Sequence, residues 1–267
     1  MKLLDKAWAC VIKDARIDAS YKLSFLIDVV DGLIMVAAYG LLAGLFVNQR
    51  FDGFTPQGFV LVGVAGNAAI MTALICFSQA VRGLQTAGAI KAVLATPTPA
   101  LTVVLLSSIY PFFRAALDLA MWLVAAWLLG APLVGPTGES LLAAVLVFVV
   151  SAAAMAGPGF GSAAFAVVFK RGDPIVWFYG AVSLLAGGVL FPVAALPVWL
   201  REAGHWLPTT HALEALRVVL LEGGGISAVR DPLMTLGILA LLGVPAGMLA
   251  LGWSVRHARR TGTLGHV

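Results

Sequence analysis

Residues 83–99 read GLQTAGAIKAVLATPTP and separate two long apolar runs of the chain. The stretch is too polar to continue a membrane span and too short to form a domain. Pro97 and Pro99 end any helix that begins here, because proline lacks the backbone N–H that a helix interior needs. The sequence predicts a short helix over residues 84–94, and its apolar side chains share one face of about 120°: Leu84, Ala87, Ile90 and Leu94.

The composition on both sides of this stretch is that of an integral membrane protein. Of 267 residues, 61% are hydrophobic and only 11% are charged, and the mean hydropathy is +0.98. Soluble domains carry about 25% charged residues. Cys10 and Cys76 lie in different segments, which gives no CxxC motif and no disulfide framework. We therefore expect an all-α polytopic membrane protein.

Five apolar runs are long enough to cross a bilayer, which takes roughly 20 residues. They are residues 25–46, 59–81, 101–129, 141–169 and 233–255. A sixth run, 175–191, is short and breaks into a proline-rich stretch. We expect six spans, forming one domain over residues 23–267 after an N-terminal segment, residues 1–22.

The distribution of basic residues sets the expected orientation. With a cytoplasmic N-terminus, most of the 17 Lys and Arg residues lie inside. The four that lie outside are Arg50, Arg201, Arg217 and Arg230. Both termini are then cytoplasmic, and so is the predicted helix over residues 84–94.

Two amphipathic segments flank or interrupt the spans. In residues 1–22, Trp8 shares a face with leucine, valine and isoleucine, whereas Lys13 and Arg16 lie opposite. This pattern is typical of a helix lying in the membrane interface, which either anchors the first span or also contacts a partner. Residues 192–222 are cut into pieces too short to span and predict an outer re-entrant or interfacial hairpin of two helices. We expect Thr209 or Thr210 to cap the second of these helices. The candidate gate residues of the whole hairpin are Pro192, Pro197, Trp199, Trp206, Pro208 and Arg217.

Four charged residues fall inside predicted spans, where ionisable groups are functional candidates. Arg114 and Asp118 are spaced to pair within one helix, either as a self-neutralised pair or as partners for a polar substrate or another subunit. Asp28 and Asp31 lie in the first turns of span 1, where the helix dipole favours carboxylates. The glycine-dense residues 157–161 indicate a kink or close helix contact, or a hinge in a substrate path.

The common sequence motifs for nucleotide binding, hydrolysis, metal binding and nucleic-acid binding are not found in this sequence. No Walker A motif predicts nucleotide binding, and no HExxH or nucleophile elbow predicts hydrolysis. The four histidines are better explained as solvated interfacial residues than as metal ligands. No basic stripe with interleaved aromatic residues indicates nucleic acid.

Taken in order, these features resemble the membrane subunits of type 2 ABC exporters, the ABC-2 permeases. The resemblance rests on the N-terminal helix, six spans, Gly88 to Pro97 after span 2, residues 169–171 before span 5, and the Pro/Trp/Leu series 191–217 before span 6. It departs at two positions, Gln85 and Lys91, where the family often has acidic residues.

The resemblance implies an exporter of two permeases, alike or related, and two separate ABC ATPase subunits that hold ATP and Mg²⁺. No cofactor is then expected in this chain. The helix over residues 84–94 would be the ATPase-coupling helix, with Leu84, Gln85, Ala87, Gly88, Ile90, Lys91 and Leu94 as its contact residues. The substrate path would lie between two copies, lined by spans 1, 2 and 5, in a prokaryotic plasma membrane.

These features are compatible with four hypotheses of function. We expect ATP-driven export of a hydrophobic or amphipathic substrate such as a drug or lipid. The alternatives are a polysaccharide or glycolipid exporter of the same family, a proton-driven transporter or channel, and a multi-span membrane enzyme. The few tyrosines disfavour a sugar channel, and no cluster of catalytic side chains supports the enzyme.

Overall fold

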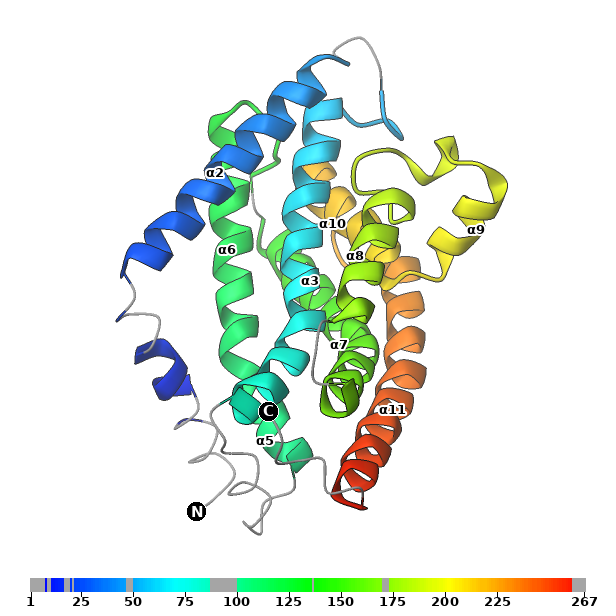
Figure 1. Ribbon diagram of the computed structural model, residues 1–267. Helices are drawn as coiled ribbons and strands as arrows, with labels where there is room; N and C mark the ends of the chain where they lie inside the picture. Colours follow the sequence, from blue (N-terminus) through cyan, green and yellow to red (C-terminus); the bar gives the residue numbers. More distant parts are fainter. Residues whose placement is uncertain are drawn as a thin grey trace.

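The computed structural model describes Trp8 and residues 11–16, 20, 22–46, 50–86, 100–135, 137–169 and 173–260. This part of the chain is almost entirely helical, with one isolated bridge between Phe51 and Phe54. Figure 1 shows its helices, which are α2 (Lys22–Gly44), α3 (Pro56–Thr86), α5 (Ala100–Ser107), α6 (Ile109–Leu128), α7 (Gly138–Phe169), α8 (Pro174–Ala186), the 3-10 turn η1 (Val193–Ala195), α9 (Val198–His205), α10 (Pro208–Glu222) and α11 (Arg230–Arg260).

The helices form one bundle with α3 at its centre (Figure 1). On one side α3 packs against α2 and α6, and on the other it packs against α7, which in turn packs along α11. We name the two ends of the bundle after short helices. The α9 end carries α9 and the start of α3, and the α5 end carries α5 and the last turns of α3, α7 and α11.

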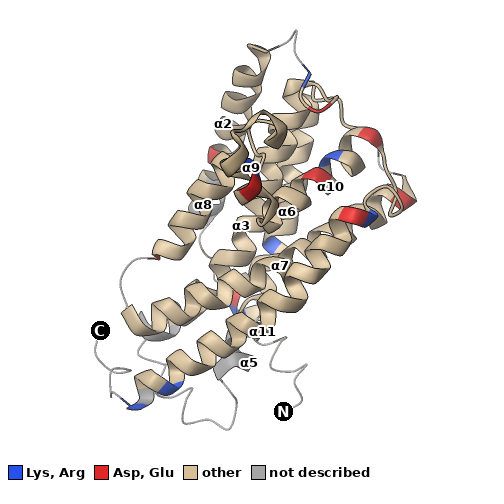
Figure 2. Ribbon diagram, turned by 90° about the vertical axis from the view of Figure 1, so that its right-hand side faces the viewer, with Lys and Arg blue, Asp and Glu red and all other residues tan. Residues whose placement is uncertain are grey.

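Four helices of the described chain are long and apolar enough to cross a membrane: Pro56–Gly83, Leu105–Leu128, Gly138–Phe169 and Arg230–Ala258. Most residues of α7 and α11 are uncharged, and the charged residues lie near the ends of these helices (Figure 2). Helices α2 and α8 contribute shorter apolar stretches, Val29–Gly44 and Pro174–Ala186. The prediction of an all-helical membrane protein is confirmed, while the count of six spans stays a prediction.

The third apolar run, residues 101–129, contains a helix break that the sequence did not predict. It divides at Ser108 into α5 and α6, and the Ser108 amide donates to the Leu105 carbonyl (3.2 Å), three residues back. Pro111 explains the break, because its ring has no N–H to donate and crowds the carbonyl four residues earlier, that of Ser107. Leu105–Leu128 nevertheless remains long and apolar enough to cross a membrane, so a span in this run is supported and only its break at Ser108 was not predicted.

The short apolar run over residues 175–191 also ends earlier than predicted. Helix α8 has 13 residues, about 20 Å of helix, and stops at Ala186 rather than near Phe191. Gly187 caps it, and Gly188 follows with a φ of +72°. Only glycine adopts such a backbone conformation at low cost, so the Gly187-Gly188 pair turns the chain toward α9.

Helix α10 is a core helix and not a membrane-facing one. Leu213, Leu216 and Val219 are almost completely buried and join the main core with residues of α3 and α7. Its predicted cap is wrong: Leu207 precedes the first turn, Pro208 occupies that turn, and Thr209 and Thr210 lie within the helix. Proline is favoured at this position because its missing N–H would have no helical partner. Gly223 ends the helix with a φ of +70°, a left-handed conformation that glycine adopts readily.

A close crossing of α7 and α11 explains the glycine-dense residues 157–161. A methyl group on Gly157 would lie 2.6 Å from the backbone of Gly243, and one on Gly247 would collide with the Gly157 carbonyl. Small residues at such a crossing let two helix backbones approach each other. The interpretation as a close helix contact is confirmed.

Candidate functional site

The predicted coupling residues begin inside α3. Leu84 and Gln85 belong to its last turn, so this helix runs from the α9 end directly into the predicted coupling segment. The other residues of that segment lie outside the described residues: Ala87, Gly88, Ile90, Lys91 and Leu94. The structure therefore places the entrance to the segment at the α5 end of the bundle.

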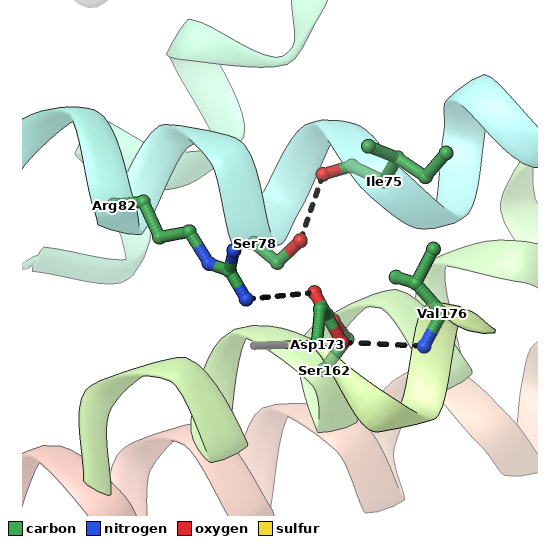
Figure 3. Close-up of polar contacts among 6 residues, drawn as sticks. All are labelled: Ile75, Ser78, Arg82, Ser162, Asp173 and Val176. Atoms are coloured by element: carbon green, nitrogen blue, oxygen red, sulfur yellow. Dashed lines mark hydrogen bonds and ion pairs between the residues drawn. The ribbon is translucent and has the colours of Figure 1, made fainter. Parts of the chain in front are cut away.

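One turn before this entrance, a polar cluster joins three helices (Figure 3). Asp173 precedes α8 and accepts a hydrogen bond from the Val176 amide (3.2 Å), as an N-cap residue does. Its other oxygen accepts from the Ser162 hydroxyl of α7 (2.6 Å) and lies 3.6 Å from Nη2 of Arg82 on α3. This Arg82–Asp173 contact ties the end of α3 to the connection between α7 and α8.

Midway along the bundle, the Arg114–Asp118 pair is confirmed. Arg114 Nε donates to Asp118 Oδ1 at 2.9 Å along one face of α6. Both side chains are partly exposed. Asp31 of α2 is exposed too, and Asp28 lies one turn before it in the same helix.

Arg217, which the sequence analysis assigned to the outer side of the membrane, is buried inside the protein. Its side chain is 5% exposed and lies 3.4 Å from the centre of the Phe59 ring. Its Nη2 donates to the carbonyl oxygens of Gly188 (2.6 Å) and Val189 (3.3 Å), and its Nε donates to that of Phe59 (3.3 Å). Arg217 thus supplies donors to the chain that leaves α8 and fastens it to α3.

A second polar link at this level joins α3, α8 and α10. The Ser183 hydroxyl lies 2.7 Å from Asn67 Oδ1 and 3.1 Å from Thr209 Oγ1. Ser183 and Thr209 are completely buried. Hydrogen bonds between buried polar groups fix the relative positions of the helices that carry them.

The comparison with known families agrees with this arrangement. The family model described as ABC-2 type transporter matches residues 7–221, most of the chain. The chain belongs to the ABC-2 type transporter family. No curated protein matches the sequence. Membership makes this chain a multi-pass membrane component of a transporter, in a family whose permeases normally work with an ABC ATPase and are not themselves catalytic.

The match ends within the last residues of α10, so it covers the elements on which the resemblance rested except the last predicted span, which is α11. In this ABC-2 chain the hairpin residues divide into two groups. Pro192 and Pro197 border η1 and α9, where Trp199 and Trp206 are 72% and 78% exposed. Pro208 and Arg217 are buried in α10. The exposed tryptophans and the buried arginine therefore lie on different sides of the same hairpin.

The N-terminal residues are helical where the structure describes them. Trp8, Lys13 and Arg16 are exposed, and Lys13 pairs with Asp14 at 2.9 Å. Whether this segment lies in a membrane interface stays a prediction. Among the residues that the structure describes, no group of three potential metal ligands is found.

Sequence reasoning missed the Arg82–Asp173 contact and the Asn67–Ser183–Thr209 link. Asp173 carries a local signal, since Asp before Pro is typical of a helix start. Its contacts with Ser162 and Arg82 depend on how α3, α7 and α8 pack, which no local pattern contains. The polar side chains of α3 and α8 were each isolated in apolar runs, so only the fold brings them together.

Proposed function

We propose that this ABC-2 chain is the membrane-spanning subunit of an ATP-driven exporter for hydrophobic or amphipathic substrates. Two copies, or this chain and a related permease, would form the substrate path. Separate ABC ATPase subunits would bind ATP and Mg²⁺. Family membership supports the class of protein, and the course of α3 supports the coupling route.

The proposed route runs through the predicted coupling helix, residues 84–94, which begins in the last turn of α3. An ATPase that binds residues 84–94 would pull on a helix that continues without a break to the α9 end. The Arg82–Asp173 contact would pass part of that movement to the connection between α7 and α8. The same movement would then be transmitted to both halves of the bundle.

The orientation proposed for this subunit follows its basic residues. The α5 end would face the cytoplasm, with the N-terminal helix in the inner interface. Helices α2 and α8 would complete six spans, with both chain ends inside a prokaryotic plasma membrane. The hairpin of α9 and α10 would close the outer exit and meet lipid through its exposed tryptophans.

The coupling proposal is tested with the full chain and the ATPase encoded beside it. Gly88→Asp and Ile90→Asp should each lower ATP-driven transport at least tenfold and weaken co-purification of the ATPase. Gly135→Asp is the matched control, because Gly135 lies in the connection before α7 with open space around it. Normal transport by both variants, or transport by the isolated chain without any ATPase, would refute the proposal.

Proton-driven transport is the second candidate, and the carboxylates of Asp31 and Asp118 midway along the bundle favour it. The two candidates differ in their energy source. Transport into vesicles with ATP held constant should persist after a proton uncoupler is added. A loss of transport under these conditions would favour proton coupling.

A further inference from the structure

A pocket of about 200 Å³ lies between α2, α3 and α6. Its α3 wall consists of small side chains at helical spacing, Ala65, Ala68, Ala69 and Thr72. Residues spaced by three and four lie on one face of a helix, so this row of small side chains leaves space where larger ones would fill the interface. The pocket is therefore a consequence of the α3 sequence.

The opposite wall is formed by longer side chains of α6. Met121 and Trp122 line it together with Leu119 and Ala115. Trp122 crosses toward α2, where its Nε1 occupies the place that a side chain on Gly32 would need, 2.6 Å from that Cβ position. Asp31 and Met121 are both exposed, so the pocket opens onto the surface of the chain.

The charged groups that line the pocket are both carboxylates, those of Asp31 and Asp118, and the described lining residues include no Lys or Arg. The indole N–H of Trp122, a donor, is directed toward Gly32 of α2. The Thr72 hydroxyl donates to the Ala68 carbonyl (3.2 Å), which leaves only its lone pairs for a ligand. Asp118 is already paired with Arg114, so Asp31 supplies the additional negative charge.

The depth of these carboxylates makes their presence significant. Asp118 lies 13 residues beyond the start of the apolar stretch Leu105–Leu128, about 20 Å along the helix, and Asp31, which lines the same pocket, belongs to the apolar stretch Val29–Gly44 of α2. A charged side chain at such depth in a membrane is costly and typically faces a functional cavity or a partner. An aromatic ring beside two carboxylates is also the combination that attracts organic cations.

From this cavity, its acceptors and its aromatic wall, we propose that the pocket binds the cationic head group of an amphiphilic substrate, such as a quaternary or protonated amine. This inference rests on the proposed export function and narrows its substrate class. The head group would contact Asp31 and the face of Trp122, while its apolar part would leave along the surface beside Met121.

Binding is tested on the purified full chain by equilibrium dialysis with two probes of similar size and opposite charge. Phenyltrimethylammonium should bind, and benzenesulfonate should not. Asp31→Asn should weaken phenyltrimethylammonium binding about tenfold, the ratio that corresponds to a contact of about 1.4 kcal/mol. Asp31→Glu should restore most of the affinity, because it keeps the charge.

Two further variants separate the pocket from a general effect of charge. Ala68→Leu should abolish binding of the cation by filling the pocket without changing any charge. Asp231→Asn, in the first turn of α11, is the control and should bind normally. Size-exclusion profiles of all variants show whether the fold is kept. Equal binding of the two probes, or unchanged binding by both Asp31→Asn and Ala68→Leu, would overturn the inference.

The dialysis needs neither ATP nor an ATPase, so it separates this inference from the proposed function. Cation binding without ATP-driven transport would uphold the pocket and refute the exporter. ATP-driven transport of neutral or anionic amphiphiles, with no cation binding, would uphold the exporter and refute the pocket.

Discussion

At the scale of single residues, Arg217 carries a large structural role. It is almost completely buried, and its guanidinium donates to carbonyl groups of Phe59, Gly188 and Val189. The last two carbonyls follow the end of α8, where no helical partner remains for them. One side chain therefore satisfies backbone groups from two distant parts of the sequence.

Replacing Arg217 should unfold the α9 end at lower temperature. Arg217→Ala leaves buried carbonyl groups without their donor and removes a packed side chain, which should cost about 2–5 kcal/mol of unfolding free energy. Arg217→Lys should lose less, because it keeps a charged donor. Thermal unfolding in detergent measures both changes. Arg230→Ala, at an exposed position, is the control, and an equal loss in that variant would contradict the role assigned to Arg217.

Asp173 combines an N-cap, a hydrogen bond to Ser162 and a contact with Arg82, and two variants separate these roles. Asp173→Asn keeps a good cap but removes the charge. Because Arg82 is partly exposed, we expect Asp173→Asn to change unfolding free energy by less than about 1 kcal/mol. Asp173→Ala also loses the cap and should cost about 1 kcal/mol more.

The two Asp173 variants are compared by chemical denaturation in detergent and by transport with the ATPase partner. Under the proposed coupling route, Asp173→Asn should lower transport per ATP hydrolysed, although its stability is nearly unchanged. Equal stability of Asp173→Asn and Asp173→Ala would contradict the cap. Normal transport efficiency in Asp173→Asn would show that the contact with Arg82 has no part in coupling.

At the scale of helices, the crossing of α7 and α11 predicts opposite effects of the same substitution one turn apart. Gly157→Ala places a methyl group against the Gly243 backbone and should destabilise the protein by about 1–3 kcal/mol. Gly161→Ala meets open space and should stabilise it by about 0.5–1 kcal/mol. Thermal unfolding compares the two, and a gain in stability for both would show that the crossing tolerates a wider separation.

The sequence predicted the helices well wherever an apolar run decided them. Residues 25–46 became Lys22–Gly44, and residues 141–169 became Gly138–Phe169. It failed where one residue overrides a run, as Pro111 does between α5 and α6 and Gly188 does after α8. Hydropathy also left the environment of α10 open, since Leu213 and Leu216 would be equally apolar facing lipid or facing α3.

The contacts of the candidate site also fall into two groups, those that the sequence could predict and those that it could not. The Arg114–Asp118 pair was predictable because it follows from spacing within one helix. The carbonyls around Arg217 and the Arg82–Asp173 contact were not, because each joins segments far apart in the sequence. The pocket beside Asp31 needed three helices to be placed before its small α3 residues could be seen as a wall.

At the scale of the whole molecule, the proposed orientation can be tested by labelling. In a chain whose Cys10 and Cys76 are replaced by Ser, Gly135→Cys and Arg260→Cys lie toward opposite ends of the bundle. A membrane-impermeant maleimide should label Gly135→Cys in intact cells, and Arg260→Cys only after the membrane is opened. Labelling of Arg260→Cys in intact cells would contradict a cytoplasmic α5 end.

The contacts of Arg217 also bear on how the chain is made. Phe59, Gly188 and Val189 all precede Arg217 in the sequence, so a ribosome has already produced every carbonyl that the guanidinium needs. Inserting an unpaired arginine into a membrane costs free energy. This cost is lower when the carbonyl acceptors of the arginine are already in place. We therefore expect α10 to be the element that closes the α9 end of the bundle during biogenesis, and a chain stopped before residue 217 to leave that end open.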